Sequence, residues 1–78
     1  MPDNIVGAHI RRLRYQQGLT QDALAARCTR LGWDISRGTL AKVEAQVRCV
    51  SDSEMLVLAR ALKVAVDALY PSAGKNRR

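Results

Sequence analysis

The sequence predicts an all-α fold, a compact bundle of five short helices. Apolar residues recur with a 3.6-residue period in nearly every segment, and no segment sustains the alternation of a half-buried strand. Apolar types make up 47% of the 78 residues, a normal share for a globular protein. A chain of this length buries only about 60–65% of its unfolded surface, too little to enclose a large active-site cavity. We expect one domain over residues 1–71 and a basic, flexible tail over residues 72–78.

The first two helices are predicted on either side of Gly18. Asn4 is a good N-cap for the first, over about residues 5–17, and Gly18 supplies its left-handed stop. Thr20 caps the second helix, which Gly32 ends. The residues expected to face inward in these two helices are Val6, Ile10, Leu13, Leu24, Cys28 and Leu31.

A connector leads into the third helix, and Trp33 and Ile35 are expected to pack from it into the core. Ser36 is the N-cap of the third helix. Its residues expected to face inward are Leu40, Val43 and Val47.

The fourth helix begins with the clearest local signal in the chain. Ser51 and Glu54 have the spacing of a capping box, in which each side chain accepts a hydrogen bond from an otherwise free backbone N–H. The inward residues that follow are Met55, Leu58, Ala59 and Leu62. A fifth, short helix is expected over residues 66–70, with a weak cap at Ala65 and a stop at Pro71.

The charge of the chain favours an anionic partner. Thirteen Lys and Arg against seven Asp and Glu give a net charge of +6 and a pI near 10.2. Residues 1–50 carry eight basic and four acidic side chains, a net charge of +4. A small domain this basic most often binds nucleic acid, and the first two-thirds of the chain should face it.

Catalysis is disfavoured, because the sequence offers no nucleophile with a base, no paired carboxylates and no spacing typical of a metal site. The only histidine, His9, is expected to be a surface residue. Cys28 is expected to be a small core residue, Cys49 lies in a loop, and a single bridge between them stays open. We therefore expect no enzyme activity, no metal, no cofactor and no small-molecule ligand.

Nothing in the sequence predicts export or a membrane span. The first residues lack the basic-then-apolar order of a signal peptide. The most apolar stretch, residues 55–70, is interrupted by Arg60, Lys63 and Asp67. A cytoplasmic protein with reduced cysteines is the expectation.

Five segments, taken together and in order, carry a family resemblance. They are IRRLR (10–14), GLTQDALA (18–25), ISRGTLAKVE (35–44), LARALKV (58–64) and DALY (67–70). They closely resemble the Cro/repressor-type (Xre) helix-turn-helix family over about residues 6–70. The resemblance implies a lambda-repressor-like DNA-binding domain. Its second helix docks on the DNA backbone and its third enters the major groove.

The resemblance, together with the physics of helices, implies a set of DNA contacts. The start of a helix suits a phosphate, and a helix in the major groove reads base edges with its outward side chains. The expected base contacts are Arg37, Gly38, Ala41 and Lys42. The expected phosphate contacts are Thr20, Gln21, Ser36, Thr39, Gln46 and Arg48. The arginines expected to be merely solvated are Arg11, Arg12, Arg27 and Arg30.

The family also typically pairs an Arg near the end of its first helix with a Glu at the end of its third. Arg14 and Glu44 match these positions, so the resemblance implies an ion pair that holds the third helix against the first. Relatives of this length often form homodimers through the fourth and fifth helices. The candidate dimer contacts are Val64, Val66, Leu69 and Tyr70, which alternatively only close the core.

The chain departs from the family pattern on both sides of the third helix. The stretch from Ala25 to Ser36 is about five residues longer than usual for a motif whose turn takes about 3–4 residues. Either the second helix gains about a turn or the connector lengthens. Gln46 stands where Gly is usual, so a left-handed cap there is mildly strained and the third helix is expected to run on through Val47.

The leading functional prediction is a sequence-specific regulator of transcription that occupies an operator in double-stranded DNA as a homodimer, usually as a repressor. It would act in the bacterial cytoplasm, on the nucleoid. A phage repressor, a restriction–modification controller and an antitoxin-type regulator are equally compatible with the sequence. The alternative of another class is a protein-interaction module that keeps this fold but reads few bases.

Overall fold

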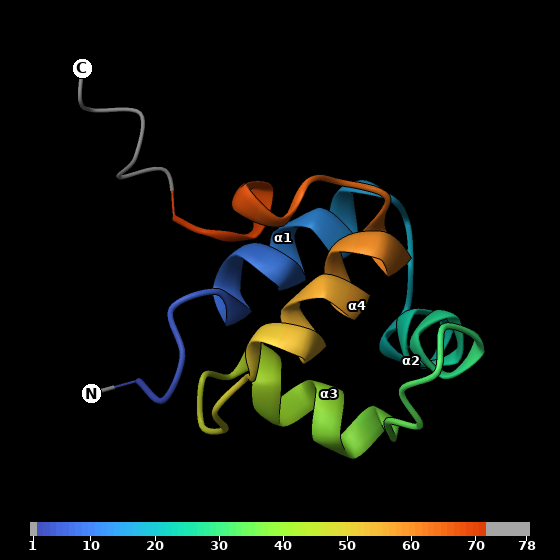
Figure 1. Ribbon diagram of the computed structural model, residues 1–78, viewed down its shortest axis with the longest axis horizontal. Helices are drawn as coiled ribbons and strands as arrows, with labels where there is room; N and C mark the ends of the chain where they lie inside the picture. Colours follow the sequence, from blue (N-terminus) through green and yellow to red (C-terminus); the bar gives the residue numbers. More distant parts are fainter. Residues whose placement is uncertain (1, 72–78) are drawn as a thin grey trace.

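The computed structural model describes residues 2–71, and in that part of the chain the all-α prediction is confirmed. The elements are α1 (Gly7–Gln16), α2 (Gln21–Arg30), α3 (Arg37–Glu44), α4 (Asp52–Leu62) and η1 (Val66–Leu69) (Figure 1). The predicted fifth helix is thus a 3-10 helix of 4 residues, because only this short stretch lies between the uncapped Ala65 and the extended Tyr70. The predicted tail, residues 72–78, lies outside the described residues.

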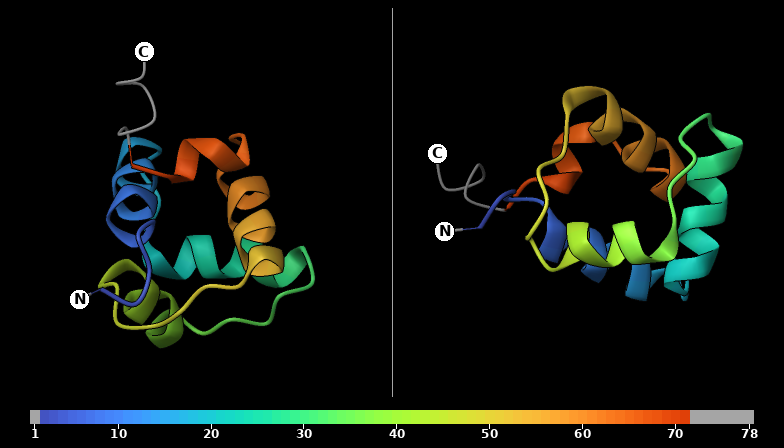
Figure 2. Two further views of the ribbon diagram at one scale, coloured as in Figure 1. Left: turned by 60° about the vertical axis from the view of Figure 1, so that its left-hand side comes forward. Right: turned by 90° about the horizontal axis from the view of Figure 1, so that it is seen from below.

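The helices surround one central core, and α3 lies at the rim of the bundle (Figure 2). α3 packs against both α1 and α2, while α4 packs against α1, α2 and η1. This arrangement supports α3 from behind on two sides and leaves its outer face free.

Side-chain oxygens cap the starts of α2, α3 and α4, as the sequence predicts. The capping residues are Thr20, Ser36 and Ser51, and each accepts a hydrogen bond of 3.0–3.2 Å from the backbone N–H three residues later. Glu54 in turn accepts from the Ser51 N–H at 3.0 Å, which completes the predicted capping box. These bonds satisfy N–H groups that a helix cannot pair internally.

All four α-helices end with the same left-handed turn. At each helix end, one residue has left-handed backbone angles. The N–H of the residue after it donates to the helix carbonyl five residues earlier in the chain. Gly18 (φ 69°) and Gly32 (φ 102°) make the turn after α1 and α2, as predicted. Gln46 (φ 65°) and Lys63 (φ 59°) make it after α3 and α4, where a side chain is strained. The prediction that α3 runs on through Val47 is therefore wrong, since the carbonyl bonds of the turn outweigh the strain at Gln46.

Aliphatic side chains from every element form the core. The largest fully buried side chains are Ile10, Leu24, Cys28, Leu40, Val43, Leu58, Leu62 and Leu69. Two residues predicted to face inward, Leu31 and Val47, are instead 43% and 61% exposed. Both lie past the last turn of a helix, where the helical period no longer sets the direction of a side chain. Ile35 is buried as predicted, and Trp33 packs half-buried against the core.

The extra residues before α3 lie in the connector. α2 has 10 residues and ends at Arg30, so residues 31–36 separate it from α3. Among residues 2–71, no helix has the length and apolar character needed to cross a bilayer.

Candidate nucleic-acid interface

The outer face of α3 carries the residues predicted to contact bases. Arg37, Gly38 and Lys42 are exposed, and Ala41 is half-buried at the edge of a groove. A methyl group added at Gly38 would meet only Ser36 Oγ, at 3.9 Å. The backbone of α3 is therefore open to close approach between its two cations.

Ser36 and Thr39, two of the predicted phosphate contacts, are paired at the start of α3. Ser36 Oγ accepts from the Thr39 N–H at 3.1 Å and donates to Thr39 Oγ1 at 3.1 Å. The pair holds both hydroxyls beside the first N–H groups of the helix, which have no intrahelical acceptor.

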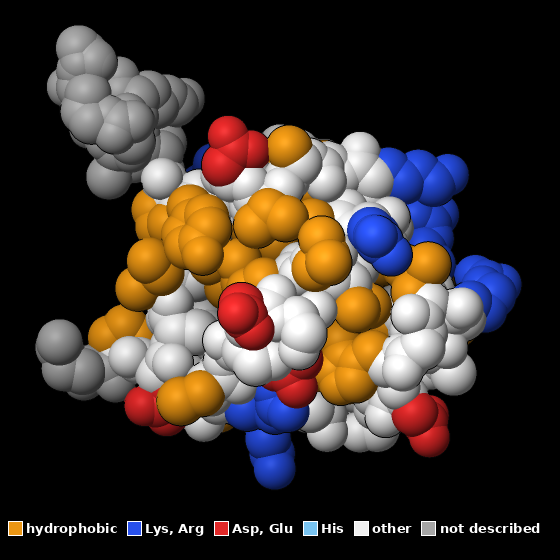
Figure 3. Space-filling model, in the orientation of Figure 1, with side chains coloured by type: hydrophobic (Ala, Val, Ile, Leu, Met, Phe, Trp, Pro, Cys, Tyr) orange, Lys and Arg blue, Asp and Glu red, His pale blue; other side chains and the backbone are white. Residues whose placement is uncertain are grey.

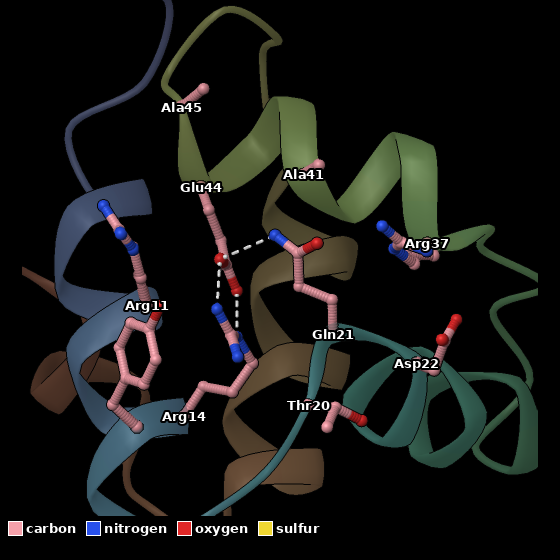
Figure 4. A pocket seen from close by; sticks show the side chains of 10 residues that line it. Arg11, Arg14, Thr20, Gln21, Asp22, Arg37, Ala41, Glu44 and Ala45 are labelled. Carbon is pink, nitrogen blue, oxygen red and sulfur yellow. Dashed lines mark hydrogen bonds and ion pairs between the residues drawn. The ribbon is translucent and has the colours of Figure 1, made fainter.

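An open groove of about 520 Å³ lies between α1, the start of α2 and α3 (Figure 4). Thr20 and Gln21 line it from α2, and Arg37 and Ala41 line it from α3. Of these, the residues predicted to contact the DNA backbone and those predicted to contact bases come from different segments of the chain. They nevertheless share one surface. Figure 4 shows the groove open toward the viewer, with the N-terminus of α2 below α3.

An ion pair closes the floor of this groove. Arg14 Nε and Nη2 donate to Glu44 Oε2 at 2.7 Å and to Oε1 at 3.0 Å, and the two side chains are 6% and 3% exposed. Arg14 Nη1 also donates to the Leu19 carbonyl at 2.8 Å, and Gln21 Nε2 donates to Glu44 Oε1 at 3.1 Å. The hydrogen bonds to Glu44 hold the pKa of Arg14 above its ordinary value. The network ties α1, the loop after it, the start of α2 and the end of α3 into one unit.

Arg11 and Tyr15 also line the groove, and the sequence did not assign them to it. Tyr15 is 61% exposed, with the Arg11 and Arg14 guanidinium carbons 5.4 Å and 4.6 Å from its ring centre. The positively charged guanidinium of Arg11, and after it that of Arg14, lowers the pKa of the Tyr15 hydroxyl. The signal in the sequence is spacing, because residues 11, 14 and 15 share the face of α1 that carries the ion pair.

The charges of the groove favour an anion only modestly. Arg14 and Glu44 neutralise each other, which leaves Arg11 and Arg37 against Asp22. Asp22 lies in the first turn of α2, where a carboxylate stabilises the helix. What distinguishes this groove from the rest of the surface is therefore the placement of its hydrogen-bond donors more than its net charge.

Asn4 clamps the start of α1 to the end of α3. Its Oδ1 accepts from the N–H groups of Val6 at 3.1 Å and Gly7 at 2.7 Å. Its Nδ2 donates to the carbonyls of Val43 at 3.1 Å and Arg48 at 2.8 Å. The prediction of Asn4 as the N-cap is wrong, because α1 begins at Gly7, two residues later than predicted, and its N-cap is Val6, which makes no side-chain cap bond. Asn4 lies ahead of the helix and still accepts from the N–H groups at its start.

Gly7 permits this close approach, because a Cβ atom there would collide with the Val43 carbonyl oxygen. The Asp3 N–H donates to the Gln46 carbonyl at 2.8 Å, and Gln46 Nε2 donates to the Asn4 carbonyl at 3.0 Å. The side-chain donor of Gln46, a predicted phosphate contact, is therefore used within the fold.

Arg48, the other phosphate contact predicted after α3, is engaged in the same way. Its Nη1 and Nη2 donate to Glu54 Oε1 at 3.0 Å and Oε2 at 3.2 Å, and Nη1 also reaches the Cys49 carbonyl at 2.9 Å. Its guanidinium carbon lies 5.8 Å from the Trp33 ring centre. The arginine thus joins the α2–α3 connector to the start of α4.

The described residues hold little that resembles a catalytic site. Cys28 and Cys49 are both free, so the bridge that the sequence left open does not form. Burial raises the pKa of the Cys28 thiol to about 11, which keeps it protonated and unreactive. Within residues 2–71, no three His, Cys, Asp or Glu side chains are grouped as metal ligands would be.

The helix-turn-helix family model matches residues 10–69, which include every element from α2 to η1 and most of α1. The chain belongs to this family. The match agrees with the Xre-type resemblance of the sequence. No similar protein was found among curated proteins.

Three solved structures resemble the chain over most of its length. The restriction–modification controller protein C.AhdI from Aeromonas hydrophila is 32% identical, over 83% of this chain and 91% of its own, with a TM-score of 0.74. The clp gene regulator ClgR from C. glutamicum is 29% identical, over 92% and 88%, with a TM-score of 0.75. The hypothetical transcription factor NHTF from Neisseria is 23% identical, over 96% and 80%, with a TM-score of 0.78, and supports the fold alone.

In this helix-turn-helix protein, α2 and α3 form the motif and residues 31–36 form its long turn. Family membership and the first two neighbours support a DNA-binding regulator of transcription rather than an enzyme.

Proposed function

We propose that the protein is a sequence-specific regulator of transcription that inserts α3 into the major groove of double-stranded DNA. The observation that carries the proposal is the outer face of α3, where exposed Arg37 and Lys42 flank the small residues Gly38 and Ala41. A helix with this surface can approach base edges closely while its long side chains reach hydrogen-bonding groups. The family match supports the same placement.

Each residue of this face has a distinct role. Arg37 forms a bidentate contact with guanine, which is worth about 1–3 kcal/mol of discrimination against another base. Lys42 binds a second guanine or a phosphate. Gly38 and Ala41 admit the DNA to the helix backbone.

The DNA backbone is bound at the groove beside α3. Thr20 and Gln21 present the N-terminus of α2 to a phosphate, and Gln21 is held in place by its bond to Glu44. Arg11 joins them from α1, and Ser36 with Thr39 binds the backbone at the start of α3. Gln46 and Arg48 contribute less, because their side-chain donors are used within the fold.

The regulator is proposed to act as a homodimer on two half-sites about 34 Å apart. Val64 and Val66 are half-buried and Tyr70 is 44% exposed, so these side chains are available for a contact between copies. Leu69 was a candidate as well, but it is fully buried and closes the core.

The most economical role is repression, in which operator occupancy blocks transcription. Among the three kinds of regulator that the sequence left open, the likeness to C.AhdI favours a restriction–modification controller. Such a protein works in the bacterial cytoplasm, bound to the nucleoid.

Binding to labelled duplexes at increasing salt tests the proposal. The DNA upstream of the protein's own gene should be retained, and a footprint should show paired half-sites. The logarithm of the affinity should fall with the logarithm of salt by about 0.9 per phosphate contact. The preferred duplex should bind about 10³-fold or more tightly than random DNA. Equal binding to all duplexes, or none, would instead support the protein-interaction module.

A further inference from the structure

A second basic surface lies away from α3, where the C-terminal ends of α2 and α4 meet. A groove of about 360 Å³ is lined there by Arg27 and Arg30 of α2 and by Arg60 and Lys63 at the end of α4. Leu31 and Ala61 complete it, and none of these described lining residues is acidic. In Figure 3, Lys and Arg side chains gather toward the right-hand side, over α2 and the end of α4.

Helix dipoles explain part of this cluster. A cation in the last turn of a helix is stabilised by about 0.3–1 kcal/mol, and Arg27, Arg30 and Arg60 occupy such positions. Arg27 Nη1 also donates to the Ala61 carbonyl at 3.0 Å, which fixes one cation at the groove. The dipole does not explain why both helix ends bring their cations into one groove, where the like charges repel.

Lys63 adds a second, independent observation. It occupies the left-handed position after α4, with φ 59° and ψ 41°, where Gly would be free of strain. The chain therefore bears a backbone strain at the residue that supplies the fourth cation. The turn after α4 tolerates this strain, as the turn at Gln46 does, and it places the Lys63 side chain at the groove beside the other three cations.

The apolar part of the groove indicates the class of ligand. Leu31 is 43% exposed beside the cations. A phosphate group or a DNA backbone would pair with the cations but leave this side chain uncovered. A second copy of the chain docked by this same groove is disfavoured, because the four cations of one groove would face the four of the other. An acidic peptide with an aliphatic side chain satisfies both features.

We propose that this groove binds an acidic segment of another protein, with an aliphatic side chain of that segment packed on Leu31. No residue of the groove belongs to α3 or to the groove beside it. The protein can therefore hold DNA on one surface and an acidic partner on the other, so that DNA binding brings that partner to the operator.

Two doubly charge-reversed variants of the full chain separate the two surfaces. R30E/R60E alters the groove, and R11E/R12E makes the same change in net charge on α1. All four residues are exposed, and a thermal melt checks that each variant folds. The probes are a fluorescein-labelled peptide, Glu-Glu-Leu-Glu-Glu-Leu-Glu-Glu, an all-Glu peptide of equal length, and duplex DNA.

The wild type should bind the Leu-containing peptide more tightly than the all-Glu peptide at physiological salt. R30E/R60E should weaken that binding by about tenfold or more and R11E/R12E by less than about threefold. Duplex binding should show the opposite order of losses. The peptide measurement does not depend on DNA binding, so a failure of the proposed function would leave it intact.

Three results would overturn the proposal. Equal losses of peptide binding in the two variants would mean that only net charge acts. Equal binding of the two peptides would remove the role of Leu31. A loss of duplex binding confined to R30E/R60E would assign the groove to DNA.

Discussion

Arg14 of α1 and Glu44 at the end of α3 form a buried, bidentate ion pair with N–O distances of 2.7 Å and 3.0 Å. Gln21 shares the same carboxylate, so the start of α2 is oriented by the bond that holds α3. A buried ion pair contributes little net stability, but removal of one partner leaves a charge without compensation. The pair therefore matters chiefly because it fixes the positions of the two helices proposed to meet DNA.

Removal of one partner of this ion pair should strongly destabilise the fold. Glu44→Ala is expected to lower the free energy of unfolding by about 3–5 kcal/mol, a large share of the roughly 4–12 kcal/mol available to a domain of this size. Urea denaturation followed by circular dichroism measures it. The double variant R14M/E44L removes both charges and should cost less than Glu44→Ala alone. An unchanged urea midpoint for Glu44→Ala would show that the pair is not buried in solution.

Gly7 and Gly38 form a matched pair of tests. Gly7→Ala places a methyl group against the Val43 carbonyl oxygen, so it should destabilise the fold by about 1–3 kcal/mol. Gly38→Ala has open space and should stabilise α3 by about 0.5–1 kcal/mol. The same Gly38→Ala variant should weaken duplex binding, because the methyl group lies on the face that approaches the bases. Gly7→Ala with wild-type stability would contradict the clamp between α1 and α3.

Lys63 offers a way to stabilise the fold. Lys63→Gly relieves a left-handed backbone strain of roughly 1 kcal/mol. The midpoint of thermal unfolding should rise by about 4–8 °C for a domain of this size. Gln46→Gly relieves similar strain but also loses the hydrogen bond from Nε2 to the Asn4 carbonyl, so its gain should be smaller. A lower midpoint for Lys63→Gly would mean that its side chain makes a stabilising contact.

Stability should depend on pH through Glu54. The hydrogen bond from Arg48 is the main cause that holds the pKa of this carboxyl below its ordinary value. A lowered folded pKa adds stability above the unfolded pKa, near 4.3, and this stability is lost as pH falls through the folded pKa. Glu54→Gln should therefore be less stable than wild type at pH 6, with the gap closing toward pH 3. A gap that stays constant over this range would exclude the ion pair as its cause.

Most of the fold could be predicted from the sequence because its signals are local. The caps Thr20, Ser36 and Ser51 and the stops Gly18 and Gly32 act through neighbouring backbone groups, and all have the expected geometry. The wrong predictions of inward-facing side chains concern residues just past a helix end, where the helical period no longer sets the direction of a side chain. Leu31 and Val47 keep the apolar period, but each lies past the end of its helix and points to solvent.

The site could be predicted only in part. The outward residues of α3 follow from its apolar stripe, since Leu40 and Val43 define the opposite face. The roles of Arg11 and Gln46 could not be inferred in this way, because they depend on how α1 and the end of α3 meet. The sequence alone does not show whether the side-chain donors of a surface arginine or of a loop glutamine are used in tertiary contacts.

The central claim is that Arg37 on the exposed face of α3 reads a base. The most direct test measures the affinity of Arg37→Ala for the footprinted duplex and for random DNA, with Arg12→Ala as the control of equal charge. Arg37→Ala should reduce the preference for the footprinted duplex by about 5- to 150-fold, as a lost bidentate base contact would. Arg12→Ala should weaken both duplexes alike. If Arg37→Ala weakened both duplexes by the same factor and left the preference intact, α3 would not read DNA through this residue.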